Sequence, residues 1–131
     1  MTPNADLIGK TYPPQAFTLD AGRVAAFAAA VGHPAGGVPP TFVTAAEHAT
    51  LGSVIGDPEL GLDYSRVVHG EQRYEWHRSL EEGETLTVQA GIEDIRSKGG
   101  LSFVTVRTEL RDESARVVVV ARSVLIVRGS T

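Results

Sequence analysis

The sequence predicts an α+β fold in which an antiparallel sheet wraps around one buried helix, and two observations lead to it. The first is a helix expected over about 41–51, which is rich in small residues and has apolar residues around much of its circumference. Such a helix is usually buried. The second is a run of strand-like segments after it, joined by short turns that favour antiparallel hairpins. The curved face of such a sheet needs apolar cover, and the small-residue helix supplies it.

The N-terminal third is predicted to hold a lead-in, an edge strand and a first helix. Residues 1–9 are expected to be loosely ordered, and two prolines keep 10–17 out of a sheet interior. Asp20 can cap a helix that runs to the residue before Gly32, which supplies a left-handed stop. The residues expected on the buried face of this helix are Val24, Phe27, Ala28 and Val31.

Beyond residue 64 the chain is predicted to form strands. The expected strands are 65–80, 85–95, 101–111 and 115–127, separated by the turns EEGE, KGG and DES. The second of them alternates apolar and polar residues, as in a strand with one buried face. The last contains the run VVVVA and is expected inside the sheet. No internal repeat is visible, so residues 1–131 are predicted to be one domain.

Composition argues against several classes of function. The chain of 131 residues has a formal net charge of −4 and no basic stripe, which argues against nucleic acid or an anionic membrane as a partner. It has no cysteine, so disulfides and thiolate metal sites are excluded. The N-terminus lacks the layout of a signal peptide, and the longest apolar run is far shorter than the roughly 20 residues that span a bilayer. A cytoplasmic protein without a metal or cofactor is expected.

Two stretches, GGVPPTF at 36–42 and VVHGEQRYEWHRSLEEGETLTV at 67–88, resemble segments of the MaoC-like dehydratase family. The first, GGVPPTF at 36–42, resembles the APPTF segment that opens the central helix in the N-terminal halves of these proteins. The second, VVHGEQRYEWHRSLEEGETLTV at 67–88, is similar to the family pattern HGEQ…Y…HRPL…GDTL. Here Ser79 replaces a proline and Glu84 replaces an aspartate. The resemblance covers roughly 7–127.

The resemblance implies a fold, a substrate and an assembly. The fold is the hot-dog fold, an antiparallel sheet of about five strands around a central helix. The substrate is an acyl thioester of coenzyme A or of a carrier protein. Hot-dog domains pair, so a homodimer or a heterodimer with a catalytic MaoC-like chain is implied. The acyl-binding subunit of the mycobacterial (3R)-hydroxyacyl-carrier-protein dehydratase is a relative in this sense.

The groups that carry the family's chemistry are missing from this chain. The family hydrates trans-2-enoyl thioesters reversibly, using an aspartate and a histidine of a GD-x-NP-x-H segment and a backbone N–H at the start of the central helix. In the matching segment, His33 stands in the place of the aspartate. The stretch between Pro34 and Gly36 is shortened, and the catalytic histidine is lost with it. Pro40 replaces the glycine whose N–H faces the carbonyl, since proline has no N–H. The resemblance therefore implies a non-catalytic half that holds the acyl chain.

Several residues are candidates for a site, each with an alternative reading. The expected substrate contacts are Thr41, Phe42, Gln72, Tyr74 and Trp76. His33 is either a replacement general base or a solvated residue after a helix end. Glu47 is either the acid of a hot-dog thioesterase or a residue that faces an interface or solvent at an exposed helix edge. The aromatic pair on 65–80 is either the wall of an acyl tunnel or an ordinary core or dimer contact.

His69 and His77 would lie on the same face of one predicted strand, but they do not suggest a metal site. Eight strand residues place them about 26 Å apart, which is too far to share an ion.

Three hypotheses follow. The first is a substrate-holding subunit of a MaoC-like enoyl-thioester hydratase or dehydratase. The second is a thioesterase that uses Glu47, and the third is a catalytically silent module that binds acyl thioesters.

Overall fold

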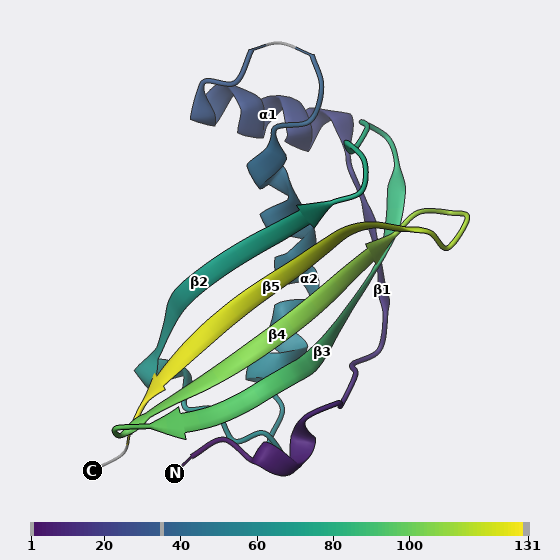
Figure 1. Cartoon of the computed structure of the whole chain (residues 1–131). Coiled ribbons are helices and arrows are strands. Elements are labelled where there is room, and N and C mark those ends of the chain that lie inside the picture. Colours follow the sequence, from purple (N-terminus) through teal and green to yellow (C-terminus); the bar gives the residue numbers. More distant parts are fainter. Residues whose placement is uncertain (1, 35, 130–131) are drawn as a thin grey trace.

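One antiparallel sheet of five strands wraps around a central helix in the computed structural model, which describes residues 2–34 and 36–129 (Figure 1). The strand order is β1-β3-β4-β5-β2, so β1 and β2 form the two edges. Figure 1 shows α2 behind the sheet and α1 across one end of it. This confirms the predicted α+β class with five strands around one helix.

The strands agree with the prediction in order and differ from it at their ends. They are β1 (Gln15–Thr18), β2 (Val67–Trp76), β3 (Thr85–Lys98), β4 (Leu101–Arg111) and β5 (Val117–Arg128). The edge strand predicted over 10–17 is reduced to four residues, and only an isolated bridge from Thr11 to Gly91 continues the pairing. The last strand lies between β4 and β2, which confirms its predicted interior position.

The first helix, α1 (Ala21–Val31), begins and ends where the local signals place it. The side chain of Asp20 accepts a hydrogen bond from the backbone N–H of Arg23 at 2.9 Å. Gly32 ends the helix in the left-handed conformation with φ of 72°. The predicted buried face is only partly correct, because Val24 is buried but Val31 is 54% exposed. The first turns of α1 pack on the sheet end, and its last turn extends beyond it.

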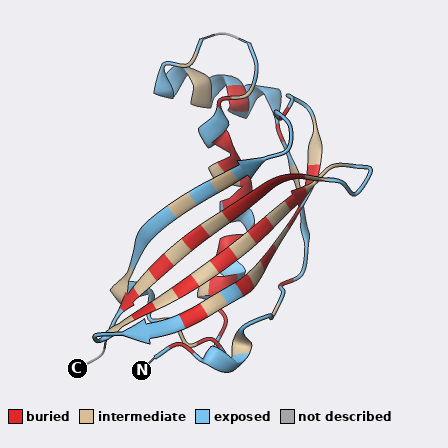
Figure 2. Cartoon of the chain, viewed as in Figure 1, coloured by how far each residue is buried: buried red, intermediate tan, exposed pale blue. Residues whose placement is uncertain are grey.

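The central helix is longer than predicted. A 3-10 turn (Pro40–Phe42) leads into α2 (Val43–Ile55), which extends beyond the predicted end at residue 51. Its buried residues are Val43, Ala46, Glu47, Thr50, Leu51 and Val54. Figure 2 shows these as a red stripe that faces the sheet. The opposite side is exposed, including His48 and Ala49, so the apolar residues around this helix are not all buried.

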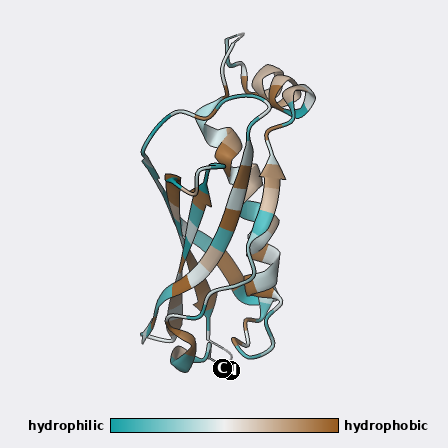
Figure 3. Ribbon diagram, turned by 90° about the vertical axis from the view of Figure 1, so that its right-hand side faces the viewer, coloured by the Kyte–Doolittle hydropathy of each residue, from teal (hydrophilic) through white to brown (hydrophobic). Residues whose placement is uncertain are grey.

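The core lies between the concave face of the sheet and α2, in two clusters. One surrounds Phe42 at the start of α2, and the other surrounds Val54 near its end. Along β4 every second residue is buried, from Ser102 to Leu110, as expected for a strand with one face on the core. Figure 3 gives a view from the side, with hydrophobic residues on the strands and on α2.

The N-terminal segment contacts β3 and the loop after α2. Residues Ala5–Leu7 form a 3-10 turn, and the N–H of Gly9 donates to the carbonyl of Ile92 at 2.8 Å. A buried carboxylate anchors the next residues. Asp57 Oδ2 accepts hydrogen bonds from Lys10 Nζ and from the Tyr12 hydroxyl, both at 2.7 Å. These contacts join the lead-in to the loop after α2.

Among the described residues, no helix is both long enough and apolar enough to cross a lipid bilayer.

Candidate functional site

The start of α2 provides few free backbone donors. The preceding loop contains Gly36 and Gly37 at φ of 95° and 77°, values that glycine adopts easily. Two prolines follow, and Pro40 occupies the first helical positions, where its fixed φ suits a helix. Thr41 therefore carries the first backbone N–H after Val38, and the N–H of Phe42 is already bonded to the carbonyl of Pro39 at 2.9 Å. The predicted shortening falls at Ala35, which lies outside the described residues.

A cavity of about 240 Å³ lies beside this helix start, at the end of β2. Its lining residues are Val38, Pro40, Trp76, Ser79 and Leu80. None of these side chains is ionisable. Trp76 is 40% exposed and forms one wall, and its ring centroid lies 6.2 Å from that of Tyr74. The geometry suits an apolar group that enters from the helix start.

A polar cluster lies next to this cavity, between α2 and the sheet, where Tyr74 contacts Trp76. Its members are Thr44, Glu47, Gln72, Tyr74 and Ser123, and we call it the inner polar cluster. The Glu47 carboxylate accepts hydrogen bonds from the hydroxyls of Ser123 at 2.6 Å and Tyr74 at 3.3 Å, and from Gln72 Nε2 at 3.1 Å. The hydroxyls of Thr44 and Tyr74 lie 2.6 Å apart. Burial raises the pKa of the Tyr74 phenol, so the phenol remains a neutral donor at neutral pH.

Glu47 is buried, which corrects the interpretation that it faces solvent or an interface. It is 1% exposed. The cause is its position on the stripe of α2 that packs on the sheet, where Ser123 and Gln72 supply neutral hydrogen-bond partners. None of the ion pairs among the described residues includes Glu47. The protein thus holds a carboxylate in its interior by neutral donors alone.

The five predicted substrate contacts are divided among four environments. Thr41 is exposed at the helix start. Phe42 is 3% exposed and packs its ring against Phe27, with centroids 5.4 Å apart, so it is part of the core. Gln72 and Tyr74 belong to the inner polar cluster, and Trp76 lines the cavity. The structure brings the last three together on the helix-facing side of β2.

The remaining candidates lie elsewhere. His33 comes after Gly32, the residue that ends α1, and it is half-buried. Its backbone N–H donates to the carbonyl of Ala28 at 2.9 Å. The two strand histidines do not share a face, because the pairing of β2 with β5 shifts between His69 and Glu71. This bulge places one extra residue, Gly70, in the strand. Among the described residues, no group of three or more histidine, aspartate or glutamate side chains is arranged to hold a metal ion.

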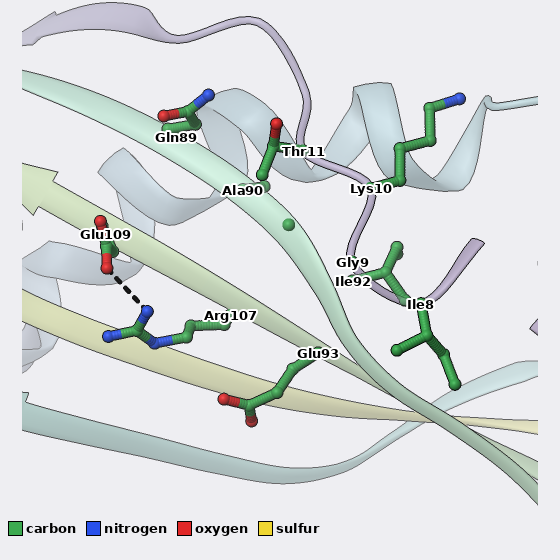
Figure 4. Close-up of a pocket in the computed structure, with 11 residues that line it drawn as sticks. Ile8, Gly9, Lys10, Thr11, Gln89, Ala90, Ile92, Glu93, Arg107 and Glu109 are labelled. Carbon is green, nitrogen blue, oxygen red and sulfur yellow. Dashed lines mark ion pairs between the residues drawn. The ribbon is translucent and has the colours of Figure 1, made fainter.

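A second hollow, of about 370 Å³, lies where the N-terminal segment passes β3 (Figure 4). Its charged lining is paired. Arg107 Nη1 lies 2.7 Å from a Glu109 oxygen, and Glu93 binds Arg122 at 3.0 Å. Burial raises the pKa of Glu109, but Arg111 and Arg107 outweigh it, so the pKa of this carboxyl is lowered. Since Lys10 is also paired, with Asp57, this hollow offers a ligand no unpaired charge.

Sequence reasoning missed Thr44, Ser123 and three cavity residues. Ser123 could have been found, because it interrupts the apolar pattern of β5 at an inward-facing position. Val38, Ser79 and Leu80 carried no such signal, since their proximity depends on how the loop before α2 meets the end of β2.

Comparison with known sequences places this chain in a family. A family model described as FAS1-like, dehydratase domain region, matches residues 24–121. A UPF0336 protein of Streptomyces griseus is 37% identical over 147 aligned residues, covering 99% of this chain and 98% of that protein. A UPF0336 protein of Leifsonia xyli is 39% identical over 116 residues, covering 88% of this chain and 74% of the relative. The first alignment is longer than this chain of 131 residues. It therefore contains gaps opposite the relative's residues.

Comparison with solved structures identifies the fold. The HadBC (3R-hydroxyacyl-ACP dehydratase) complex from Mycobacterium tuberculosis contains a chain with a TM-score of 0.78 and 22% identity, covering 92% of this chain and 97% of its own. A MaoC-like dehydratase has a TM-score of 0.80 and 17% identity, covering 95% of this chain and 43% of its own. The (R)-hydratase from A. caviae involved in PHA biosynthesis has a TM-score of 0.65 and 16% identity, covering 90% of this chain and 94% of its own.

The family model spans well over half of the sequence, and the relatives align with nearly all of it. The chain therefore belongs to the FAS1-like dehydratase region family and has the hot-dog fold of the MaoC-like dehydratases.

Proposed function

We propose that this chain is the substrate-holding subunit of an (R)-specific enoyl-thioester hydratase or 3-hydroxyacyl-thioester dehydratase, and that a partner chain performs the chemistry. One observation carries the proposal: the cavity beside the start of α2 is lined by Val38, Pro40, Trp76, Ser79 and Leu80. Hydration of an enoyl thioester needs an acid and a base close to the double bond. This lining can hold an acyl chain but cannot move a proton.

The start of α2 also supports the proposal that this chain binds the substrate and that a partner performs the chemistry. Two prolines stand where an oxyanion would be bound, and they contribute no N–H. Stabilisation of a developing oxyanion by aligned N–H groups is often the largest single catalytic effect. We expect the partner to supply these N–H donors. The contacts of this chain with the acyl group then help to position the substrate.

The sheet edge formed by β2 is the proposed surface for this partner. β2 pairs with β5 on one side only, and Trp76 and Val68, at 40% and 48% exposure, leave apolar surface on it. An unpaired edge strand is a template for pairing with another chain. A hot-dog domain that docks there continues the sheet and places its own helix start near the Trp76 cavity. The two chains would then share one substrate, an acyl group on coenzyme A or on a carrier protein.

Co-purification and activity together test the proposal. The chain is co-expressed with a protein from the same organism that carries an intact GD-x-NP-x-H segment, and hydration of crotonyl-CoA is followed by the loss of enoyl absorbance. We expect activity in the mixture that exceeds the activity of either chain alone. Full activity of this chain by itself would contradict the proposal, and so would the absence of a stable complex.

We do not favour a thioesterase that uses Glu47, because its carboxylate is 1% exposed and enclosed by its hydrogen-bond partners. Hydrolysis of acyl-CoA that disappears in Glu47→Gln and survives His33→Ala would reverse this preference. Binding of acyl-CoA without turnover in any mixture would instead indicate a silent acyl-binding module.

A further inference from the structure

We propose that the inner polar cluster ends the acyl-binding groove, so that this chain selects short acyl chains and excludes long ones. The inference rests on the proposed function, since it concerns the length of the acyl group that the Trp76 cavity accepts. Three observations support it: the order of side chains along β2 and α2, their hydrogen bonds, and the size of the cavity.

The side chains between α2 and β2 change from apolar to polar over one turn of helix, starting at the cavity. Trp76, Tyr74 and Gln72 follow one another on the same face of β2, opposite the buried Val119, Ala121 and Ser123. Alternate residues of a strand are about 7 Å apart. On the helix side, Pro40 lines the cavity, and Thr44 lies four residues further into the groove. A chain that enters at Trp76 therefore meets the hydroxyls of Tyr74 and Thr44 next.

The hydrogen bonds of the cluster close the groove at this point. The Tyr74 and Thr44 hydroxyls, 2.6 Å apart, connect the edge strand directly to the helix. Behind them, Gln72 and Ser123 donate to the Glu47 carboxylate. An alkyl chain that continued between β2 and α2 would separate these partners and would lie against a buried carboxylate. Leaving several buried hydrogen-bonding groups without partners costs more than burying a few methylenes gains.

The size of the cavity sets the expected limit. Its volume of about 240 Å³ equals the liquid volume of about eight water molecules. We infer that the cavity accepts acyl groups up to about octanoyl, with an increase in affinity of about fourfold for each added methylene until the cavity is full. Beyond this length the chain has no apolar space to enter, and the affinity stops rising.

The single tryptophan of the chain provides the readout. Because Trp76 is the only tryptophan and lines the cavity, its fluorescence reports occupancy directly. The full-length chain, alone and with its catalytic companion, is titrated with butyryl-, hexanoyl-, octanoyl-, decanoyl- and dodecanoyl-CoA, with free coenzyme A as the blank. We expect affinity to rise to octanoyl-CoA and then to level off or fall. A continued rise to dodecanoyl-CoA would overturn the inference.

A variant with an apolar cluster tests the cause of the limit. Glu47→Leu, Gln72→Leu and Ser123→Ala are combined, which removes the buried carboxyl group together with two of its three donors, while the third donor, Tyr74, keeps its hydrogen bond to Thr44. We expect dodecanoyl-CoA to bind at least about tenfold more tightly than to the wild type, and butyryl-CoA to bind equally well. An unchanged length profile in this folded variant would overturn the inference.

Two further variants separate the effect of the cluster on acyl binding from an effect on folding. Tyr74→Phe removes only one hydroxyl of the bridge, and we expect it to shift the length profile in the same direction by a few-fold. Ser102→Ala is the matched control, because Ser102 is also buried but bonds to Ser97, its cross-strand partner beside the β3–β4 turn and outside the inner polar cluster, and we expect it to bind as the wild type does. If no acyl-CoA of any length binds to the chain or to the complex, the proposed function itself is contradicted. Binding without a length limit contradicts only this inference.

Discussion

Two carboxylates of this protein are buried, and they are held in different ways. Asp57, at 9% exposure, accepts a hydrogen bond from a lysine and another from a tyrosine. Glu47, at 1% exposure, has only neutral donors. Lys10 and Tyr12 hold the pKa of Asp57 at about 2. The first arrangement joins the N-terminal segment to the loop after α2, and the second lies at the proposed end of the acyl-binding groove. The difference indicates that burial of an acid alone does not mark a site, and that its partners must be considered.

Removal of the Glu47 side chain is expected to have the largest effect. Glu47→Ala leaves a cavity and deprives Ser123, Gln72 and Tyr74 of their acceptor. We expect the free energy of unfolding to fall by about 2–4 kcal/mol, measured by urea denaturation. Glu47→Gln is the control, because it keeps the volume and one acceptor oxygen and should retain most of the stability. A loss below about 0.5 kcal/mol in Glu47→Ala would show that the cluster is not a stabilising contact.

Substitution of the second carboxylate is expected to cost less. In Asp57→Asn the amide keeps one acceptor oxygen for the N–H of Glu59 or for Tyr12, but the charge that attracts Lys10 is lost. We expect a decrease of about 1–2 kcal/mol in the free energy of unfolding, determined in the same urea experiment. If this substitution proved more destabilising than Glu47→Ala, the ranking of the two clusters would be wrong.

The pH dependence of stability should separate the two carboxylates further. Asp57 has a folded-state pKa of about 2, below its ordinary value of 3.8. A depressed pKa stabilises the folded state above the ordinary value, and this stabilisation is lost as the pH falls from about 3.8 toward about 2. The difference in urea midpoint between the wild type and Asp57→Asn should therefore shrink over this interval and stay constant from about pH 5 to neutrality. A difference that persists unchanged at about pH 2 would contradict the assigned cause.

The smallest effect is expected from the lysine itself. Lys10 is partly exposed, and an exposed ion pair is weakened by salt. Lys10→Met should lower the urea midpoint slightly at low ionic strength, and the difference from the wild type should disappear at high salt. The same salt series should leave the effect of Glu47→Ala unchanged, because no cation lies in that cluster. Equal salt sensitivity of both variants would remove the distinction between them.

Local signals allowed most of the fold to be predicted. Asp20 and Gly32 fix the ends of α1 through contacts within a few residues, which a sequence displays directly. The end of α2 was predicted too early because Gly52 and Ser53 interrupt its pattern, whereas the helix continues to bury Val54 in the core. Tertiary packing outweighed the weak helical preference of these residues.

The candidate site was harder to predict because its partners are distant in the sequence. Glu47 meets Gln72 and Ser123, which lie 25 and 76 residues away, and no local pattern reveals such a pairing. The predicted shared face of Gln72, Tyr74 and Trp76 is confirmed, since all three residues lie beyond the bulge. The expectation for His69 and His77 assumed an uninterrupted strand and was wrong about their common face.

The extra residue at position 70 decides what the interior of this protein contains. A strand of the same sequence that paired regularly through Gly70, without the bulge, would continue the alternation set by Val67 and His69, and the next three inward positions would be Glu71, Arg73 and Glu75 in place of Gln72, Tyr74 and Trp76. Three charged side chains would then point at the helix, and the aromatic wall would face water. Gly70 suits the position, because a methyl group there would lie 2.4 Å from the end of the Ile126 side chain. The same sequence paired without the bulge would thus turn a charged face of β2 toward the helix without any substitution, whereas deletion of Gly70 would remove the bulge and keep Gln72, Tyr74 and Trp76 inward.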